Sequence, residues 1–207
     1  MPLPLPLRCT CGAVRGELDD ASPAVGNRMV CYCDDCQDYT RFLGRADALD
    51  PFGGSDIYQT TPSRVRITQG AEHLRIVRLS EKGMVRYYAG CCRTPIGNLM
   101  AGARWPFVGL AQPFMDHAAD GRSRDERLGP AAGYIHGRYA PGGCPPHAHP
   151  SASVAVIGRA MWRILLNMAH GSARPTPFYD DQGKLVSEPQ VLSPQERDAL
   201  RRPPASA

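Results

Sequence analysis

Residues 56–79 read DIYQTTPSRVRITQGAEHLRIVRL and contain three short runs in which apolar and polar side chains alternate. The runs cover residues 56–60, 64–68 and 74–79, and a proline and a glycine lie between them. Alternation with a period of two is typical of half-buried strands, and proline and glycine mark turns. This stretch therefore predicts consecutive antiparallel strands whose arginines face solvent.

Similar patterns lie on either side of this stretch. Residues 14–18 and 26–33 precede it, residues 85–88 follow it, and all three read as short strands. Between Asp34 and Leu43 the pattern fits one short helix, for which Asp34 is the expected N-cap. With 21 glycines and 20 prolines among 207 residues, the chain is rich in turns. We predict a mainly-β fold of layered antiparallel sheets.

The pattern changes in the second half of the chain. We expect residues 1–112 to form a mainly-β domain and residues 113–207 to form an irregular and helical extension packed on it. A helix is expected over residues 151–171, because apolar side chains recur there at helical spacing on one core-facing stripe. That stripe consists of Val154, Ile157, Met161, Ile164, Leu165 and Met168. A capping box at residues 193–196 predicts the start of a second helix, which runs to residue 200.

Charge and hydropathy argue against a nucleic-acid-binding protein and against a membrane protein. The net charge is +4, and basic residues are scattered, so we do not expect a nucleic-acid partner. No apolar stretch reaches the roughly 20 residues of a membrane span, and the alternating prolines of residues 1–7 do not fit a signal peptide. We expect a cytoplasmic protein with no membrane partner. In that compartment its eight cysteines are reduced thiols, available for metal binding or chemistry.

Seven of the eight cysteines fall into three tight groups. Buried core thiols explain one or two cysteines, but they do not explain this grouping. Thiolates at such short spacings are typical zinc ligands, so we expect one or two Zn²⁺ ions held in knuckles of the β domain. The expected ligands are Cys9, Cys11, Cys31, Cys33, Cys36, Cys91 and Cys92.

These groups carry a resemblance to a known family. The segments Cys9-Thr-Cys-Gly-Ala-Val-Arg-Gly16, Cys31-Tyr-Cys-Asp-Asp-Cys36 and Cys92-Arg-Thr-Pro-Ile-Gly97 match its motifs in order and spacing. Over about residues 7–100 the chain resembles the glutathione-dependent formaldehyde-activating enzymes and centromere protein V-like proteins. It looks most similar to an uncharacterised bacterial branch that shares the Cys-Cys-Arg-Thr-Pro-Ile-Gly form.

The resemblance implies two zinc sites with different roles. It implies that Cys9 and Cys11 join two later cysteines in a closed structural site. It also implies that Cys31, Cys33 and Cys36 hold a second zinc ion whose fourth position accepts a substrate thiol. The activity that it implies is that of a carbon–sulfur lyase acting on an aldehyde adduct of a small, glutathione-type thiol.

The third motif departs from the family pattern Cys-x-x-Cys-Gly-Thr-Pro, because Ala89 and Arg93 replace its first cysteine and its glycine. Cys91 then either supplies the missing ligand of the structural site or closes the second site. Closure would favour a non-catalytic, zinc-stabilised module whose C-terminal helices dock a partner or form a homodimer. A further alternative is that Cys91 and Cys92 act as a redox-sensing thiol pair.

Other side chains offer secondary roles. Asp34, Asp35 and Arg41 could lie on the substrate side of the second zinc site, although helix capping is the more ordinary role for the two aspartates. A turn-rich loop near residue 145 offers further ligand types. We read it as an ordinary polar loop by default, with a third metal site or a lid as the alternative. Its ligand-type residues are Cys144, His147 and His149.

Overall fold

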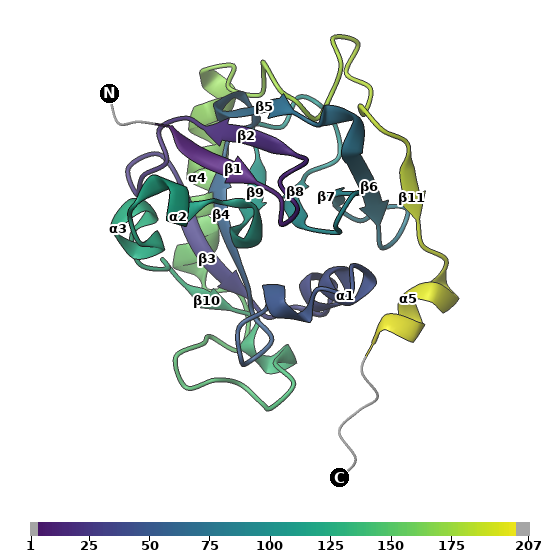
Figure 1. Cartoon of the computed structure of the whole chain (residues 1–207). Coiled ribbons are helices and arrows are strands. Elements are labelled where there is room, and N and C mark those ends of the chain that lie inside the picture. Colours follow the sequence, from purple (N-terminus) through teal and green to yellow (C-terminus); the bar gives the residue numbers. More distant parts are fainter. Residues whose placement is uncertain (1–3, 202–207) are drawn as a thin grey trace.

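A computed structural model describes residues 4–201, and the two ends of the chain, 1–3 and 202–207, lie outside it. The mainly-β prediction is confirmed, because the described residues form eleven strands in two sheets, accompanied by five α-helices (Figure 1). The strands are β1 (Leu5–Arg8), β2 (Arg15–Leu18), β3 (Asn27–Cys31), β4 (Ser55–Thr60), β5 (Val65–Gln69), β6 (Leu74–Arg78), β7 (Val85–Ala89), β8 (Pro95–Leu99), β9 (Val108–Ala111), β10 (Tyr134–Ile135) and β11 (Pro189–Val191). The helices are α1 (Asp34–Phe42), α2 (His117–Asp120), α3 (Arg124–Leu128), α4 (Val154–Ala169) and α5 (Pro194–Leu200).

The larger sheet has eight strands in the order β10-β3-β4-β9-β8-β7-β6-β11. Its inner pairs are antiparallel, whereas the edge strand β10 pairs parallel with β3 and the edge strand β11 pairs parallel with β6. Both edge strands come from the chain beyond residue 112. These short segments cover edges that would otherwise expose unpaired backbone groups.

The smaller sheet, β1-β2-β5, packs on one face of the larger sheet and encloses the main core. Leu5 and Leu7 of β1 are buried there against residues such as Tyr58 of β4. The alternating pattern works as predicted in β5, where Val65 is buried and Arg66 is exposed. Burial of one side of each strand therefore fixes how the two sheets face each other.

Helix α1 covers the opposite face of the larger sheet. Tyr39 and Leu43 pack against Val77 of β6, and the Tyr39 hydroxyl donates a hydrogen bond to the carbonyl oxygen of Tyr87 at 2.6 Å. The expected N-cap was wrong by one residue. Cys33, in an extended conformation, is the N-cap, and Asp34 is the first helical residue. Asp34 therefore does not cap the helix, but its charge lies in the first turn, where the helix dipole favours an anion.

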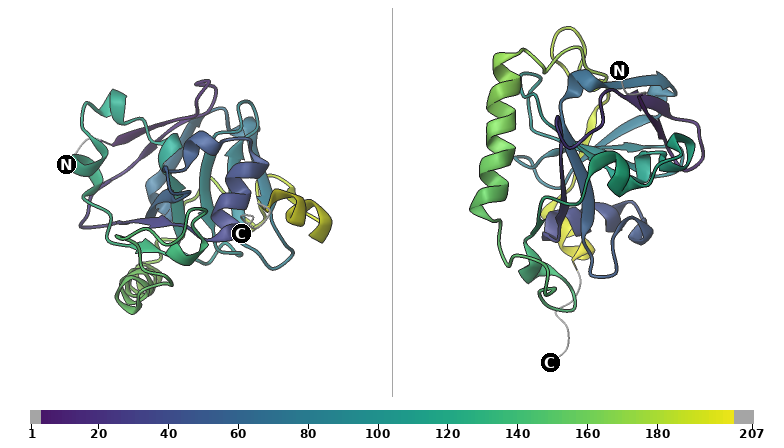
Figure 2. Two further views of the ribbon diagram at one scale, coloured as in Figure 1. Left: turned by 90° about the horizontal axis from the view of Figure 1, so that it is seen from below. Right: turned by 90° about the vertical axis from the view of Figure 1, so that its left-hand side faces the viewer.

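The predicted C-terminal helices both form. In α5 the capping box is confirmed, because the Ser193 backbone NH donates to Glu196 at 2.8 Å and the Glu196 NH donates to the Ser193 hydroxyl at 3.2 Å. In α4 the expected core-facing stripe is wrong, because Ile164 is its one buried member. The helix contacts the body through a different side, and α4 stands at the edge of the molecule in both panels of Figure 2. The exposed members of the stripe are Val154, Ile157, Met161, Leu165 and Met168.

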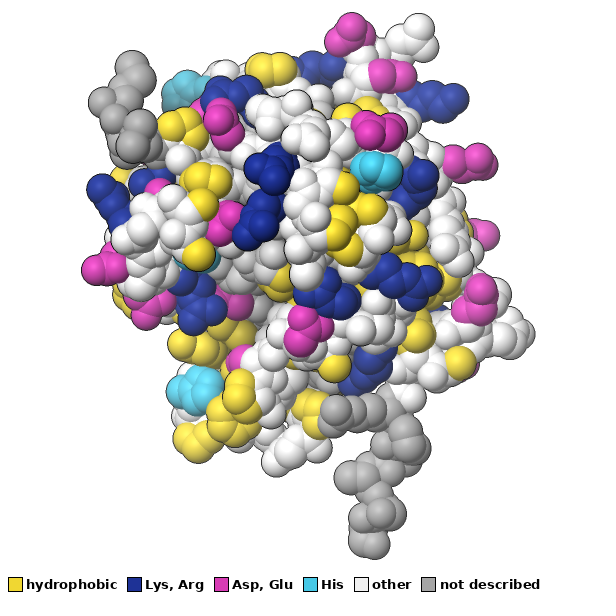
Figure 3. All heavy atoms as spheres, viewed as in Figure 1, with side chains coloured by type: hydrophobic (Ala, Val, Ile, Leu, Met, Phe, Trp, Pro, Cys, Tyr) yellow, Lys and Arg dark blue, Asp and Glu magenta, His cyan; other side chains and the backbone are white. Residues whose placement is uncertain are grey.

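The surface carries charges of both signs. On the face shown in Figure 3, Lys and Arg side chains are interspersed with Asp and Glu, and they do not form a continuous basic surface. Within residues 4–201, no helix is both long enough and apolar enough to cross a membrane.

Candidate metal centres

Cys9, Cys11, Cys91 and Cys92 meet in one place, and we call them the four-cysteine group. The first two lie in the turn between β1 and β2, and the other two lie in the turn between β7 and β8. The sulfur of Cys9 lies 3.6 Å from that of Cys11 and 3.8 Å from that of Cys91. The Cys91 sulfur lies 3.4 Å from that of Cys11 and 3.8 Å from that of Cys92. Cys91 therefore joins this group, and the expected alternative that it closes the second group is wrong.

Tight turns aim these sulfurs at one another. In the first turn the Gly12 NH donates to the Cys9 carbonyl at 2.8 Å, and Gly12 has a φ of +79°. In the second turn the Arg93 NH donates to the Ala89 carbonyl at 2.7 Å, and Arg93 has a φ of +57°. That left-handed conformation favours glycine, yet arginine occupies it here. The second turn is therefore compact enough to direct two adjacent cysteines into one group.

Further contacts hold the two turns together. The Thr94 hydroxyl accepts a hydrogen bond from the Thr10 backbone NH at 2.9 Å, and the two threonine hydroxyls lie 2.9 Å apart. Arg45, which follows α1, donates to the Thr10 hydroxyl at 3.0 Å and to the Thr94 hydroxyl at 3.3 Å. Burial works against ionisation of Cys92, but hydrogen bonds from Thr94 and from the backbone lower its pKa to about 6. The lowered pKa favours the thiolate form of Cys92, which is the form that binds a metal ion.

Gly70, between β5 and β6, lies directly against the first cysteine turn. It has a φ of +76°, and a Cβ at this position would lie 2.2 Å from the carbonyl oxygen of Ala13. The turn can approach this closely because residue 70 has no side chain. A glycine outside the cysteine motifs therefore supports the four-cysteine group.

Cys31, Cys33 and Cys36 form the three-cysteine group. Cys31 ends β3, Cys33 is the N-cap of α1, and Cys36 lies in the first turn of that helix. Their sulfurs all lie within 4.8 Å of one another, and within residues 4–201 no fourth His, Cys, Asp or Glu ligand joins them. Cys31 and Cys36 are buried, whereas Cys33 is half-buried. A metal ion held here would have three protein ligands.

A buried arginine that we did not single out from the sequence faces the three-cysteine group. Arg86 of β7 is 3% exposed, donates to Asn98 Oδ1 at 2.9 Å and lies 5.3 Å from the centre of the Tyr39 ring. Hydrogen bonds from Cys31 and Cys33, together with the charge of Arg86, hold the pKa of Cys36 well below its ordinary value. The local sequence gave no sign of this role, because Arg86 stands in an ordinary strand pattern.

Asp34, Asp35 and Arg41 lie on α1 beside the three-cysteine group but differ in what they contact. Asp34 is half-buried in the first turn. Asp35 Oδ2 lies 3.9 Å from the Arg86 guanidinium, and Asp35 Oδ1 accepts a 2.6 Å bond from Arg197 of α5. Arg41 donates to Gln37 at 2.7 Å and to Asp38 at 2.9 Å. Of these residues, Asp35 is the one that forms an ion pair with Arg86, the charged side chain beside the cysteines.

The loop near residue 145 does not gather its ligand-type side chains. Cys144 faces the Ala148 carbonyl at 3.5 Å, and His147 Nε2 lies 3.2 Å from the Tyr32 hydroxyl. His149 forms a local contact with the carbonyl of Ser151 at 2.9 Å. In the part of the chain that the structure describes, these side chains form no third group of metal ligands. Cys144, His147 and His149 therefore do not assemble the third metal site that was one alternative for this loop.

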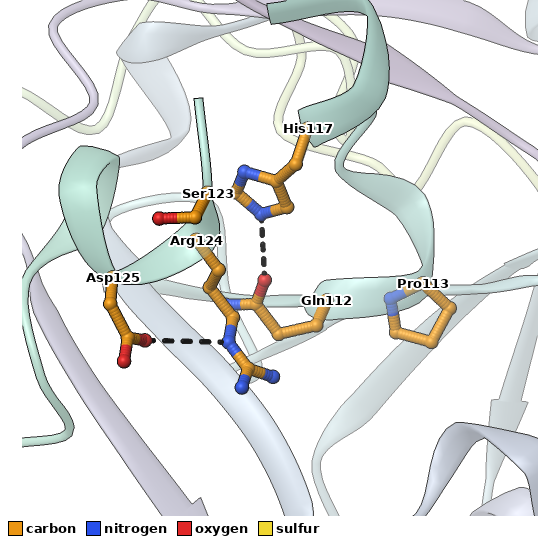
Figure 4. Close-up of a pocket in the computed structure, with 6 residues that line it drawn as sticks. All are labelled: Gln112, Pro113, His117, Ser123, Arg124 and Asp125. Carbon is orange, nitrogen blue, oxygen red and sulfur yellow. Dashed lines mark hydrogen bonds and ion pairs between the residues drawn. The ribbon is translucent and has the colours of Figure 1, made fainter. Parts of the chain in front are cut away.

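A separate hollow of about 470 Å³ lies between the segment that follows β9 and the helices α2 and α3 (Figure 4). His117 and Gln112 are hydrogen-bonded across it at 3.0 Å, and Arg124 lies 3.8 Å from Asp125. No cysteine lines this hollow, so it is distinct from both cysteine groups. Its lining is Gln112, Pro113, His117, Ser123, Arg124 and Asp125.

Comparison with known proteins places the chain in a family. Residues 1–190 match the family of unknown function DUF6151. The chain belongs to this family. No curated protein matches the sequence. The DUF6151 match includes both cysteine groups and the strands that carry them. Because the family has no assigned function, the functional argument rests on the geometry of the two groups.

Proposed function

We propose that the protein binds two zinc ions and that the two ions have different roles. Zinc prefers tetrahedral coordination by thiolates, and Zn–S bonds of about 2.3 Å place neighbouring sulfurs about 3.8 Å apart. The sulfur–sulfur distances of 3.4 Å to 3.8 Å in the four-cysteine group support such a site. Four thiolates fill the coordination sphere, so the role proposed for this group is structural.

The three-cysteine group is the proposed working site. A zinc ion held by these three cysteines would offer its fourth coordination position to a thiol sulfur and would lower the pKa of that thiol. Three thiolates and one divalent ion carry a net charge of −1, which the buried guanidinium of Arg86 balances. Asp35 lies between Arg86 and Arg197 and helps to hold both guanidinium groups in place.

The proposed reaction is carbon–sulfur bond formation or cleavage between a small thiol and an aldehyde, and the motif resemblance supports it. The thiol gives its proton to water, the thiolate sulfur donates an electron pair to the aldehyde carbon, the carbonyl π electrons move to oxygen, and the oxygen takes a proton back from water. The reverse sequence breaks the same bond, and neither direction needs an oxidant or a reductant. The single observation that carries the proposal is the absence of a fourth protein ligand at Cys31, Cys33 and Cys36 among the described residues.

Metal counting and zinc X-ray absorption test the proposal. We expect two zinc ions per chain, with an average of between three and four sulfurs each. Addition of glutathione should raise that average, because its thiol takes the open position. Cys33→Ser should lose one zinc ion and the response to thiol, whereas Cys11→Ser should lose one zinc ion and keep the response. A wild-type spectrum with four sulfurs per zinc before thiol is added would contradict the proposal.

A second candidate is a zinc-stabilised module without catalysis. The burial of Cys31 and Cys36 favours it, because burial hinders the approach of a small thiol to two of the three sulfurs. Proton NMR of formaldehyde mixed with glutathione separates the two candidates. The lyase predicts faster exchange between free thiol and hydroxymethyl adduct in the presence of zinc-loaded protein than with Cys33→Ser, whereas the module predicts equal rates.

A further inference from the structure

Helix α4 exposes a broad apolar surface, which we call the outer face of α4. Seven large apolar side chains on this one helix are between 40% and 87% exposed. A helix that is apolar around most of its circumference is ordinarily buried by a neighbour. These residues are Val154, Ile157, Met161, Trp162, Leu165, Leu166 and Met168.

The helix itself is held firmly on the body by its narrow inner side. Val156 packs against Gly133, where an added Cβ would lie 2.5 Å from the valine Cγ2. Gln59 of β4 donates to the Ala160 carbonyl at 3.1 Å. Arg163 donates to the carbonyls of residues 23 and 24, at 3.0 Å and 2.9 Å. Because these contacts fix α4, its outer face cannot turn inward.

A notch lies in the outer face at Gly158. A Cβ built there meets nothing within 4 Å, so packing within this chain does not require glycine. Glycine inside a helix lowers helix stability relative to alanine, which makes an unneeded glycine unfavourable. Val154, Trp162 and Leu165 lie four residues before, four after and seven after the notch, so they surround it on the same face. A close partner would explain why the position has no side chain.

We propose that the outer face of α4 docks against the same face of a second copy of this chain. In an antiparallel pair related by a two-fold axis at the middle of α4, between Met161 and Trp162, positions 158 and 165 lie opposite each other. Leu165 of each copy then enters the Gly158 notch of the other. The contact is self-complementary, as a two-fold interface requires. Antiparallel helices also place opposite ends of their dipoles side by side.

The size of the surface agrees with a dimer. The exposed side chains supply roughly 600 Å² of apolar surface per chain, against roughly 800 Å² per partner in a standard interface. Residues flanking α4 can supply the remainder. Lipid is a weaker fit, because membrane-surface helices carry several basic residues on their polar side. In α4, Arg163 is bonded to the body, which leaves the exposed Arg159.

Sedimentation of the zinc-loaded full chain at several concentrations tests the proposal. We expect a dimer, and we expect Gly158→Leu to weaken it by at least about 100-fold, because the leucine fills the notch at the centre of the interface. Arg159→Leu is the matched control. It adds a leucine at the rim of the same helix, and it should leave the dimer intact. Both variants should keep two zinc ions, so a change in assembly is distinguishable from failure of the metal proposal.

Vesicles of anionic phospholipid provide the second arm of the experiment. A lipid-binding α4 would give a monomer in solution that binds these vesicles, and Gly158→Leu would bind them at least as strongly because it is more apolar. That result would overturn the dimer. A wild-type protein that stays monomeric without binding vesicles would overturn it as well, and so would a Gly158→Leu protein that dimerises as strongly as the wild type.

Discussion

Gly70 supports the four-cysteine group from outside it. Its left-handed backbone and its contact with the Ala13 carbonyl leave no space for a methyl group. Many glycines tolerate alanine at a modest cost in stability, but here the nearest atom belongs to the backbone of the cysteine turn and cannot rotate away. The turn that carries Cys9 and Cys11 must therefore move when residue 70 gains a side chain.

We predict that Gly70→Ala destabilises the protein by about 2 to 3 kcal/mol more than Gly121→Ala does, because only the first substitution adds a backbone clash. Gly121 is a matched control, since it has a similar φ of +68° and no atom within 4 Å of an added Cβ. Urea unfolding measures the difference. Equal losses of stability for the two variants would show that conformation alone, and not the close contact, makes Gly70 necessary.

Arg86 acts on the three-cysteine group through its charge. A buried guanidinium without anionic neighbours is unfavourable, and a group of thiolates without a cation is unfavourable as well. Their proximity offsets both penalties. Arg86 also lies over the ring of Tyr39, so its position is fixed by α1, the same helix that carries Cys36.

Arg86→Met should lower the affinity of the three-cysteine group for zinc by about 10- to 100-fold. It should leave the affinity of the four-cysteine group unchanged. Competition with a coloured chelator measures both affinities. Arg86→Lys, which keeps the charge, should recover part of the loss. Arg75→Met is the control, because Arg75 lies on the neighbouring strand β6 and is exposed. An equal loss at both zinc ions would indicate general unfolding and not a local effect of charge.

At the scale of elements, α5 contacts α1, the helix that contains Cys36 and has Cys33 as its N-cap. Arg197 of α5 bonds to Asp35 at 2.6 Å, and the Leu200 carbonyl accepts from Arg41 at 3.1 Å. Helix α5 is short, so its capping box supplies much of its stability. The C-terminal helix therefore influences the three-cysteine group through the position of α1.

Ser193→Ala should lower the local stability of α5 by about 1 kcal/mol. It should also speed the release of zinc from the three-cysteine group several-fold. Hydrogen exchange of the α5 amides and the rate of zinc transfer to a chelator measure the two effects. Ser123→Ala is the matched control, because α3 has the same kind of capping box. If both variants released zinc at the same rate, α5 would have no specific effect on the three-cysteine group.

At the scale of the whole molecule, most of the core is formed by residues outside the cysteine groups, although Cys9 is buried in it. The main core lies between the two sheets, and α1 packs on the far face of the larger sheet. A chain of 207 residues buries roughly 70% of its unfolded surface, so metal is not required for a core to form. Metal ions held by the two groups would therefore stabilise turns of a structure whose core is formed mostly by other residues.

We predict that a chelator removes the two proposed zinc ions in sequence. The ion of the three-cysteine group should leave first, because it has fewer protein ligands, and the far-ultraviolet circular dichroism should change little. Removal of the other ion should loosen the turns that carry Cys9 and Cys91. Zinc release followed by absorbance, together with circular dichroism at each stage, checks the order. If both ions left together and the circular dichroism signal of the β-sheets were lost, the claim that the core forms without metal would be contradicted.

Much of the local structure could be predicted from the sequence. The alternation of residues 56–79 gave three strands, and the capping box at Ser193 gave α5. Both are short-range signals, which depend on neighbours within a few positions. The grouping of seven cysteines was also visible, because a cluster of one residue type stands out without knowledge of the fold.

What the sequence by itself determined is the identity and order of most elements and the seven cysteines that are candidate metal ligands. Only the tertiary structure decided that Cys91 joins Cys9, that Arg86 is buried beside Cys36, and that α4 turns its apolar stripe outward. The physical reason is that periodicity reveals which side of an element is apolar. What lies against that side depends on distant segments, whose arrangement no local pattern contains.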